Sequence, residues 1–417
     1  MKAVSLSSSE HLTPTLRPGL LDGLARRLVL GRLKGIEHGI LIIQDGERQY
    51  TFGQSVPGEK LAATITVDDT RFYGDIAFGG SIGAAESWMQ AYWDCDDLVT
   101  VVRILVRNRG LLDGMEGGLA WMSRPLQKLF HWTNRNTQRG ARRNIAAHYD
   151  LGNDFFKLWL DDSMMYSCAI FDDTTATLAE AQQTRLERVC QRLDLQPDDQ
   201  LVEIGTGWGS LAIYAASRYG CRVTTTTISK QQYELARQRI DASGMQDRIT
   251  LLLKDYRDLD GQYDKLISLE MIEAIGHEQY DMYFSKCAGL LRPGGRMLIQ
   301  AITIEDDRFE QYRKNVDFIQ RYIFPGSCIP SEKVMRETIA RVTDFRVVSV
   351  EDIGQHYATT LNRWRKNFFG KLSEVRELGH TNEFIRMWDF YLCYCEGGFL
   401  ERSISDVHLV ADRPASS

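Results

Sequence analysis

Residues 201–227 read LVEIGTGWGSLAIYAASRYGCRVTTTT, and this stretch indicates the fold class of the 417-residue chain. An apolar run that ends at Ile204 leads into the turn Gly205-Thr206-Gly207-Trp208-Gly209, and an apolar-periodic segment and a β-branched run follow. This order predicts one strand–turn–helix–strand unit. Glycines allow a sharp turn and the close approach of a ligand, and the start of the helix offers free N–H groups.

A glycine turn of this kind also occurs as a tight connection in any α/β protein, so its details matter. The dinucleotide fingerprint requires a glycine where this chain has Ser210, and Gly209 comes too early. The acid Glu203 precedes the turn, whereas the second strand ends at Thr227 without the acid that usually holds a ribose diol. This pattern is similar to the first motif of methyltransferases that use S-adenosylmethionine (SAM).

Further β-like runs alternate with helical segments along the second half of the chain. Together with the two above, the expected strands cover residues 201–204, 222–227, 249–253, 265–269, 296–301, 345–352 and 405–411. Seven strands that alternate with helices predict an α/β fold with a doubly wound, Rossmann-like sheet.

The first hundred residues predict a smaller α+β domain. Residues 20–33, 81–93 and 97–109 have helical patterns, while residues 39–80 fall into the short β-like runs ILIIQDG, RQYTFG, AATITVDD and FYGDIAFGG. Asp45-Gly46 predicts a hairpin turn. We therefore expect an N-terminal α+β domain over residues 1–120 that faces lipid or forms a dimer. A basic linker over 121–143 and a catalytic domain over 144–417 would follow.

The composition is that of a soluble globular protein, with 43% apolar residues, 25% charged residues and a net charge of -6. The negative charge argues against a general nucleic-acid binder. The eight cysteines show no metal-ligand spacing, which predicts reduced thiols in a cytoplasm and no metal site. We expect neither a signal peptide nor a membrane span, so a lipid substrate would be met at the membrane surface.

Polar residues after the second and third strands are candidates for cofactor contacts. Gln232 opens the next helix and could reach a ribose, or it could simply be an exposed residue of the helix start. Asp255 could accept a hydrogen bond from an adenine amino group while Tyr256 stacks on the base. Equally, Asp255 could be a helix N-cap.

Two acids, Glu270 and Glu273, follow the fourth strand and are site candidates because ligands of such sheets bind beyond the carboxyl ends of the strands. The alternative is an exposed first helical turn. Cys168 lies in the aromatic segment Tyr166-Ser167-Cys168, where no basic residue is adjacent. We therefore interpret it as a buried, inert thiol rather than a nucleophile.

Taken together, these motifs resemble the cyclopropane-fatty-acid synthases, a branch of the SAM-dependent methyltransferases that includes the mycolic-acid cyclopropane enzymes. The resemblance covers about residues 140–411 and rests on HYDLGNDFF, MMYSCAIF, VEIGTGWGSLAIYAA, TTISKQQ, KDYRDLDGQYDKLIS, EMIEAIGHEQY, RYIFPGSCIPS and HYATTLNRW. It implies transfer of the SAM methyl carbon to double bonds of phospholipid acyl chains. The resulting carbocation loses a proton and closes a cyclopropane ring; a relative that stops early gives a methyl- or methylene-branched chain.

The resemblance also implies a bound bicarbonate ion as the base, held by Glu273, Tyr357 and the backbone of Cys168 and Ile302. Gln300 stands where bacterial members commonly have His, although plant-type members share the Gln; an amide can donate to the ion but cannot titrate. The expected cofactor contacts, by resemblance and motif, are Tyr166, Ser167, Glu203, Gly205, Gly207, Thr227, Ile228, Gln232, Asp255 and Tyr256. A lipid-binding protein with a degenerate site is the alternative, and the intact glycine turn speaks against it.

A carbocation requires dry, aromatic surroundings, because water would quench it. The aromatic residues available for such walls, about half of which we expect to be core, are Tyr149, Phe155, Phe156, Trp159, Tyr166, Phe171, Tyr322, Phe324 and Trp388.

Basic residues predict where the protein meets its partner, a phospholipid bilayer with unsaturated acyl chains. Arg139, Arg142 and Arg143, together with the helix at residues 363–371 (RWRKNFFGK), would contact anionic lipid. We expect a peripheral protein at the inner membrane surface of the cytoplasm that forms a homodimer.

Overall fold

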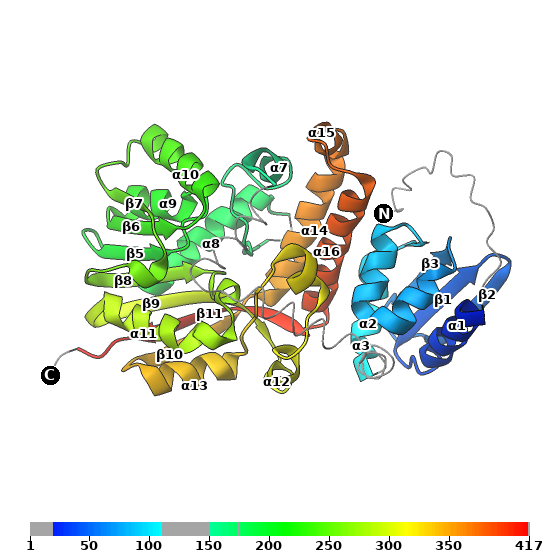
Figure 1. Ribbon diagram of the computed structural model, residues 1–417. Helices are drawn as coiled ribbons and strands as arrows, with labels where there is room; N and C mark the ends of the chain where they lie inside the picture. The colour runs from blue at the N-terminus through cyan, green and yellow to red at the C-terminus, as the bar shows by residue number, and fades with distance from the viewer. Residues whose placement is uncertain (1–19, 111–150, 174, 416–417) are drawn as a thin grey trace. The chain divides into compact units, whose positions relative to one another are not determined.

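The computed structural model describes residues 20–110, 151–173 and 175–415, which form two compact units (Figure 1). The first unit contains the described residues up to 110 together with Gly379–Glu401, and the second contains the remainder. The domain boundaries expected at residues 120 and 143 lie outside the described residues and stay predictions. None of the helices in the described ranges is long and apolar enough to cross a membrane.

The second unit is built on a seven-stranded sheet in the order β10-β11-β9-β8-β5-β6-β7. Neighbouring strands are parallel except at β11, which is antiparallel to both β10 and β9. This arrangement confirms the α/β class and all seven predicted strands. Their bounds are β5 (Gln200–Ile204), β6 (Arg222–Thr227), β7 (Ile249–Leu253), β8 (Tyr263–Leu269), β9 (Leu291–Ile304), β10 (Arg346–Asp352) and β11 (Ile404–Asp412).

Both faces of this sheet are buried, as a parallel sheet requires. Successive residues of a strand point to opposite faces, so Leu266 belongs to one apolar cluster and Ile267 to the other. The helices of this unit are α7 (Asn153–Lys157), α8 (Leu178–Leu193), α9 (Ser210–Tyr219), α10 (Lys230–Ser243), α11 (Tyr280–Leu290), α12 (Phe309–Tyr312), α13 (Glu332–Val342), α14 (Gly354–Gly370) and α15 (Leu372–Glu377). Short helical turns, η2 (Tyr256–Asp258), η3 (Ile272–Ile275), η4 (His277–Gln279) and η5 (Ile319–Ile323), complete it.

The first unit contains a four-stranded sheet in the order β2-β1-β3-β4. Its elements are α1 (Leu20–Leu33), β1 (Gly39–Asp45), β2 (Arg48–Gln54), β3 (Ala62–Val67), α2 (Arg71–Met89), β4 (Trp93–Cys95), α3 (Leu98–Arg107) and α16 (Asn382–Leu400). The hairpin predicted at Asp45-Gly46 is confirmed, because β1 and β2 pair antiparallel with Asp45 opposite Arg48.

The β-like interpretation of FYGDIAFGG, residues 72–80, is wrong, because the whole run lies in α2. Its aromatic residues suggested a strand, but the glycines serve a kinked helix instead. Gly80 has φ 59° inside the helix. A Cβ atom on Gly83 would lie 1.9 Å from the carbonyl oxygen of Asp75, so only glycine allows this close approach. The helix predicted to reach Trp93 ends at Met89, and Trp93 begins β4.

Arg386 of α16 joins three elements of the first unit. Its Nε and Nη2 atoms donate to the backbone carbonyls of Trp88 and Trp93 at 2.5 and 2.7 Å. The guanidinium carbon lies 3.9 Å from the centroid of the Trp88 ring. One planar, buried cation therefore satisfies two carbonyl groups and stacks on an aromatic ring, which a lysine cannot reproduce.

We predict that Arg386→Lys lowers the free energy of unfolding by about 2–3 kcal/mol, because buried carbonyls lose charged donors. Urea unfolding of the full chain measures this change. Arg71→Lys is the matched control: Arg71 also lies over a ring, that of Tyr92 at 4.2 Å, but 63% of its side chain is exposed. We expect a change below about 1 kcal/mol for the control. Equal losses in the two variants would contradict this role of Arg386.

Candidate active site

The glycine turn between β5 and α9 is open on one side. Gly205, Gly207 and Gly209 have φ angles of 103°, 52° and 89°, all in the region that favours glycine. A Cβ atom on Gly209 would lie 3.4 Å from the Cβ of Ala236, so this glycine lets the turn pack against α10. A Cβ atom on Gly207 would meet nothing within 4 Å. Gly207 therefore borders space that a ligand could enter beside the start of α9.

Glu203 lies beneath this turn rather than at its surface. It is buried in β5, and its Oε2 accepts a hydrogen bond of 2.6 Å from the Thr225 hydroxyl of β6. Thr225 also lies 2.6 Å from the hydroxyl of Thr206 in the turn. Burial raises the pKa of Glu203 to about 8, although the hydrogen bond from Thr225 opposes the shift. The acid supports the turn, and its predicted cofactor contact stays a prediction.

The carboxyl end of β6 holds Gln232 in place. The Thr227 hydroxyl donates to Oε1 of Gln232 at 2.8 Å, and the side chain of Ser229 caps α10. Gln232 is 6% exposed, so the interpretation as an exposed residue of the helix start is wrong. The expected contacts of Gln232, Thr227 and Ile228 with a cofactor stay predictions.

Asp255 follows β7 as the N-cap of η2 and accepts a hydrogen bond from the backbone N–H of Arg257. Its two carboxylate oxygens also bind the guanidinium of Arg257 at 2.8 and 2.7 Å. The N-cap interpretation is thereby confirmed. Tyr256 is buried, with its ring 5.5 Å from that of Tyr283. The expected contacts of Asp255 and Tyr256 with an adenine ring stay predictions.

A row of aromatic rings connects the glycine turn to Tyr357, the hydroxyl group of which donates to Glu270. Trp208 of the turn lies 5.3 Å from Phe156, and Phe156 lies 5.5 Å from Tyr166. Tyr166 lies 5.3 Å from Trp364 of α14, and Trp364 lies 5.9 Å from Tyr357. These ring-to-ring centroid distances are those of packed aromatic pairs.

Three further members of the predicted aromatic set contact this row, and the ring of Phe155 lies 5.5 Å from that of Phe156. Trp159 and Phe324 have ring centroids 5.3 and 6.3 Å from Tyr166. Trp388 belongs to α16 in the other unit, and Tyr149 lies outside the described residues.

The sequence RWRKNFFGK predicts a lipid-contacting helix over residues 363–371. That prediction is wrong for Trp364 and Phe368, which are each 0% exposed, and stays a prediction for the basic residues of the helix. The basic residues Arg139, Arg142 and Arg143 lie outside the described residues.

Glu270 is the centre of the hydrogen-bond network at the carboxyl end of β8. Its Oε1 accepts hydrogen bonds from the Ser167 hydroxyl, the Cys168 backbone N–H and the Gln300 amide at 2.8, 2.8 and 2.7 Å. Its Oε2 accepts a hydrogen bond of 2.6 Å from the Tyr357 hydroxyl. Burial raises the pKa of Glu270, while the hydrogen bonds from Tyr357, Cys168 and Ser167 oppose that shift. Four neutral donors therefore converge on one carboxylate.

Glu273 is the second acid, and its surroundings differ. One oxygen accepts a hydrogen bond of 2.5 Å from the backbone N–H of Ile302, and the other has no hydrogen-bond partner in the described part of the chain. Burial and the neighbouring charge of Glu270 raise the pKa of Glu273 to about 8. Glu273 is thus mostly protonated at pH 7. Paired acids whose surroundings separate their protonation states are typical of catalytic sites.

Gln300 of β9 bridges Glu270 to a third acid. Its amide nitrogen donates to Glu270 and, at 2.7 Å, to Asp406 of β11. Its amide oxygen lies 3.5 Å from the guanidinium of Arg185 and 3.2 Å from the ring of His408. Burial, with the nearby charges of Glu270 and Glu273, raises the pKa of Asp406 well above its ordinary value.

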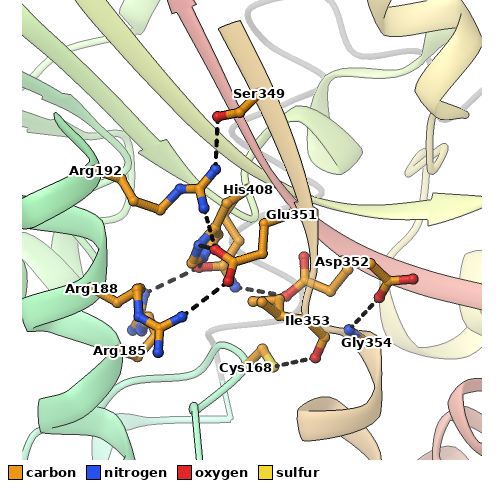
Figure 2. Close-up of polar contacts among 12 residues, drawn as sticks. Cys168, Arg185, Arg188, Arg192, Ser349, Glu351, Asp352, Ile353, Gly354 and His408 are labelled. Carbon is orange, nitrogen blue, oxygen red and sulfur yellow. Dashed lines mark hydrogen bonds and ion pairs between the residues drawn. The ribbon is translucent and has the colours of Figure 1, made fainter.

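Arg185 of α8 supplies the buried positive charge beside these acids, and it is 0% exposed. Figure 2 shows Arg185, Arg188 and Arg192 of α8 facing β10 and β11. The outer two arginines bind Glu351, which leaves Arg185 beneath them. Burial and these three arginines lower the pKa of His408 to about 3, so the ring is neutral.

Of the residues expected to hold bicarbonate, the Cys168 N–H and Tyr357 hydroxyl meet on Glu270, and the Ile302 N–H meets Glu273. Cys168 contributes its backbone, and its side chain is 0% exposed, so the interpretation as a buried thiol is confirmed. Burial raises the pKa of this thiol well above the ordinary value. Sequence reasoning named Glu270 only as one acid after a strand. It missed Arg185, Asp406 and His408, which come from segments without a recognisable motif.

The raised pKa of Glu203 predicts a pH dependence of stability. In the unfolded chain this carboxyl ionises near its ordinary pKa of 4.5, and in the folded protein near 8. The free energy of unfolding should therefore fall as the pH rises from about 5 to about 8. Glu203→Gln should flatten this slope in urea unfolding at several pH values, although Glu273 keeps part of it.

Glu180→Gln is the control for this measurement. Glu180 is exposed at the start of α8, and hydrogen bonds from Thr177 lower its pKa, so this group contributes no loss of stability between pH 5 and 8. An unchanged slope in Glu203→Gln would contradict the assignment.

The geometry agrees with what comparisons with known proteins show. Residues 136–409 match the mycolic acid cyclopropane synthetase family. The chain is 41% identical to the tuberculostearic acid methyltransferase of Mycobacterium tuberculosis, over 77% of this chain and 76% of that protein. It is 34% identical to the cyclopropane-fatty-acyl-phospholipid synthase of Escherichia coli K12, over 84% of this chain and 88% of that one.

A solved structure supports the same assignment. The mycolic acid cyclopropane synthase CmaA1, complexed with S-adenosylhomocysteine (SAH) and CTAB, superposes with a TM-score of 0.61 at 31% identity. The match covers 65% of this chain and 98% of that one. The chain therefore belongs to the mycolic acid cyclopropane synthetase family of SAM-dependent, lipid-modifying methyltransferases.

Proposed function

We propose that this enzyme adds the methyl carbon of SAM to the double bond of unsaturated acyl chains in membrane phospholipids and closes a cyclopropane ring. The observation that carries the proposal is the aromatic row between the glycine turn and the Glu270 carboxylate. In this arrangement a methyl donor would lie at the glycine-turn end of the row, a proton acceptor at the Glu270 end, and an apolar acyl chain between them.

The residues at the carboxyl ends of β5 and β6 fit SAM. Gly207 leaves space for the backbone to approach the cofactor, and the buried amide of Gln232 would bind the ribose in place of an acid. When bound, SAM supplies an electrophilic methyl group. We propose Tyr166 and Ser167 as further contacts because they lie between the glycine turn and Glu270.

The aromatic residues would protect the reaction from water. The alkene forms a carbon–carbon bond to the sulfonium methyl carbon while the carbon–sulfur bond breaks, and the second alkene carbon becomes cationic. The faces of Tyr166, Trp159 and Trp364 would stabilise this cation by about 2 kcal/mol where the site is desolvated. Trp159 and Trp364 are fully buried, which supports a dry site.

A methyl- or methylene-branched chain is the second candidate product. It is favoured by the 41% identity to the protein named tuberculostearic acid methyltransferase. Both products begin with the same carbon–carbon bond, so the shared site supports either. We further propose that the protein acts as a homodimer bound peripherally at the inner membrane surface, where the unsaturated chains are available.

Lipid analysis tests the product. Cells that express the protein should contain phospholipid acyl chains heavier by one CH₂ unit, because one carbon is added and one proton lost. Chemical derivatisation followed by mass spectrometry separates a ring from a methylene branch of equal mass. A ring would support the first candidate and a branch the second, whereas unchanged lipids with purified enzyme, SAM and unsaturated vesicles would refute both.

Gly207→Val tests the cofactor site. The new side chain would fill the open side of the turn at a backbone φ of 52°, so we expect SAM binding to be lost in isothermal calorimetry. Gly220→Val is the matched control. Gly220 also has a positive φ of 76° and an open Cβ position, but it lies at the far end of α9. The control should bear similar strain and retain SAM affinity; retained affinity in folded Gly207→Val would refute this site.

A further inference from the structure

The expected bicarbonate ion does not fit the groups that would hold it. Two of the groups expected to donate hydrogen bonds to bicarbonate are the Cys168 N–H and the Tyr357 hydroxyl. Both already donate to the carboxylate of Glu270. A third, the Ile302 N–H, binds Glu273, which is the fourth expected holder. A separate anion would have to displace these side chains from their hydrogen bonds.

The charges of the site also oppose a second anion. Burial raises the pKa values of both Glu270 and Asp406, and Arg185 is the cation that opposes both shifts. It is fully buried, and the outer arginines Arg188 and Arg192 are bound to Glu351. One buried positive charge balances one carboxylate, so a bicarbonate ion beside Glu270 would be an uncompensated charge in a poorly solvated site.

Among the three acids, Glu270 is the one that the network prepares to be an anion. It accepts four hydrogen bonds, whereas Glu273 accepts one from Ile302 and keeps an unpartnered buried oxygen. Hydrogen bonds to the charged form favour ionisation. Three donors bind Oε1 and one binds Oε2, so Oε2 retains a lone pair for a further proton.

The backbone at Glu270 is also held in an unusual conformation. Its φ is 47°, in the left-handed region that non-glycine residues seldom adopt, and its N–H donates to the Gln300 carbonyl at 2.8 Å. Such strain persists only where surrounding contacts enforce it, and it is concentrated at functional sites. Glu270 also retains some accessible surface, while its donors Cys168 and Tyr357 are buried. The carboxylate of Glu270 thus points toward its hydrogen-bond donors, and part of the residue stays accessible to a substrate.

We propose that the carboxylate of Glu270, rather than a bound bicarbonate ion, is the base of this enzyme. The inference rests on the proposed function. After methyl transfer, Oε2 of Glu270 takes a proton from the added methyl group. The electron pair of that carbon–hydrogen bond then forms the third bond of the ring at the cationic carbon. Glu270 ends the step as a neutral acid and must release its proton before the next turnover.

Gln300 acts as a positioning residue in this arrangement. Its amide nitrogen donates to both Glu270 and Asp406, and its oxygen faces Arg185 and His408. A neutral imidazole has a single N–H, so it could not donate to both acids. A glutamine at position 300, where related enzymes commonly have histidine, can therefore support Glu270 as the base.

The first test uses the parent enzyme with SAM and vesicles of unsaturated phospholipid. Product formation should change by less than about twofold when bicarbonate and CO₂ are stripped from the buffer and when bicarbonate is added back. A loss of tenfold or more that bicarbonate restores would overturn the proposal while leaving the proposed function intact. No product under either condition would refute the proposed function itself.

The second test compares two substitutions of Glu270. Glu270→Gln keeps the shape of the side chain but removes the base, so turnover should fall by about 10²–10⁴-fold while SAM affinity is retained. Glu270→Gly suits the backbone φ of 47° and leaves the four donors free. Bicarbonate or formate should then bind these donors and raise the turnover of Glu270→Gly at least about tenfold, while Glu270→Gln gains less.

Glu332→Gln is the control, because Glu332 lies in the first turn of α13 with 41% of its side chain exposed and pairs with Arg336 at 2.7 Å. It should turn over at the parent rate. A folded Glu270→Gln variant that also turns over at the parent rate would overturn the proposal. If neither Glu270 variant bound SAM, the bicarbonate response of the parent enzyme would still decide the question.

Discussion

The site depends on one carboxylate in a poorly solvated setting. A charge removed from water is tolerated only when hydrogen bonds and an opposite charge replace its hydration. For Glu270 these come from separate parts of the second unit: the segment at Ser167 and Cys168, β9 at Gln300, and α14 at Tyr357, with Arg185 of α8 as the counter-charge. The fold is what brings these segments to one edge of the sheet.

The fold itself could be predicted because its strands are short β-branched or apolar runs between glycine turns. The predicted strands from 201–204 to 405–411 all formed, since their pattern and the sheet agree. Local pattern failed where glycines served a helix: FYGDIAFGG has the aromatic and glycine content of a strand, yet Gly83 allows a close approach to Asp75 inside α2. A contact between residues eight positions apart in one helix leaves no periodic signal.

The candidate site was predictable only in part, for a related reason. Glycine turns and acids after strands follow the chain, so Gly207, Glu270 and Glu273 could be singled out from their positions. The partners of Glu270 could not be predicted, because its hydrogen bonds come from α14 and β9, which are far from Glu270 in the sequence. The prediction of lipid contact for Trp364 was wrong because it relied on neighbours in the sequence. Its basic neighbours suggested a lipid surface, whereas its ring is buried beside Tyr166.

The identities of residues 270 and 300 are physically linked. A glutamate at φ 47° directs its carboxylate into the donors of the site and becomes an acceptor for a neighbour on β9. Asp406 accepts a hydrogen bond from the same neighbour, and the Gln300 amide provides both N–H groups and an oxygen that faces Arg185. An amide does this while uncharged, whereas an imidazole with two N–H groups carries a positive charge beside Arg185. Replacing either residue alone would therefore leave a buried polar group without a hydrogen bond. Because of this energetic penalty, the residue at position 270 and the residue at position 300 depend on each other.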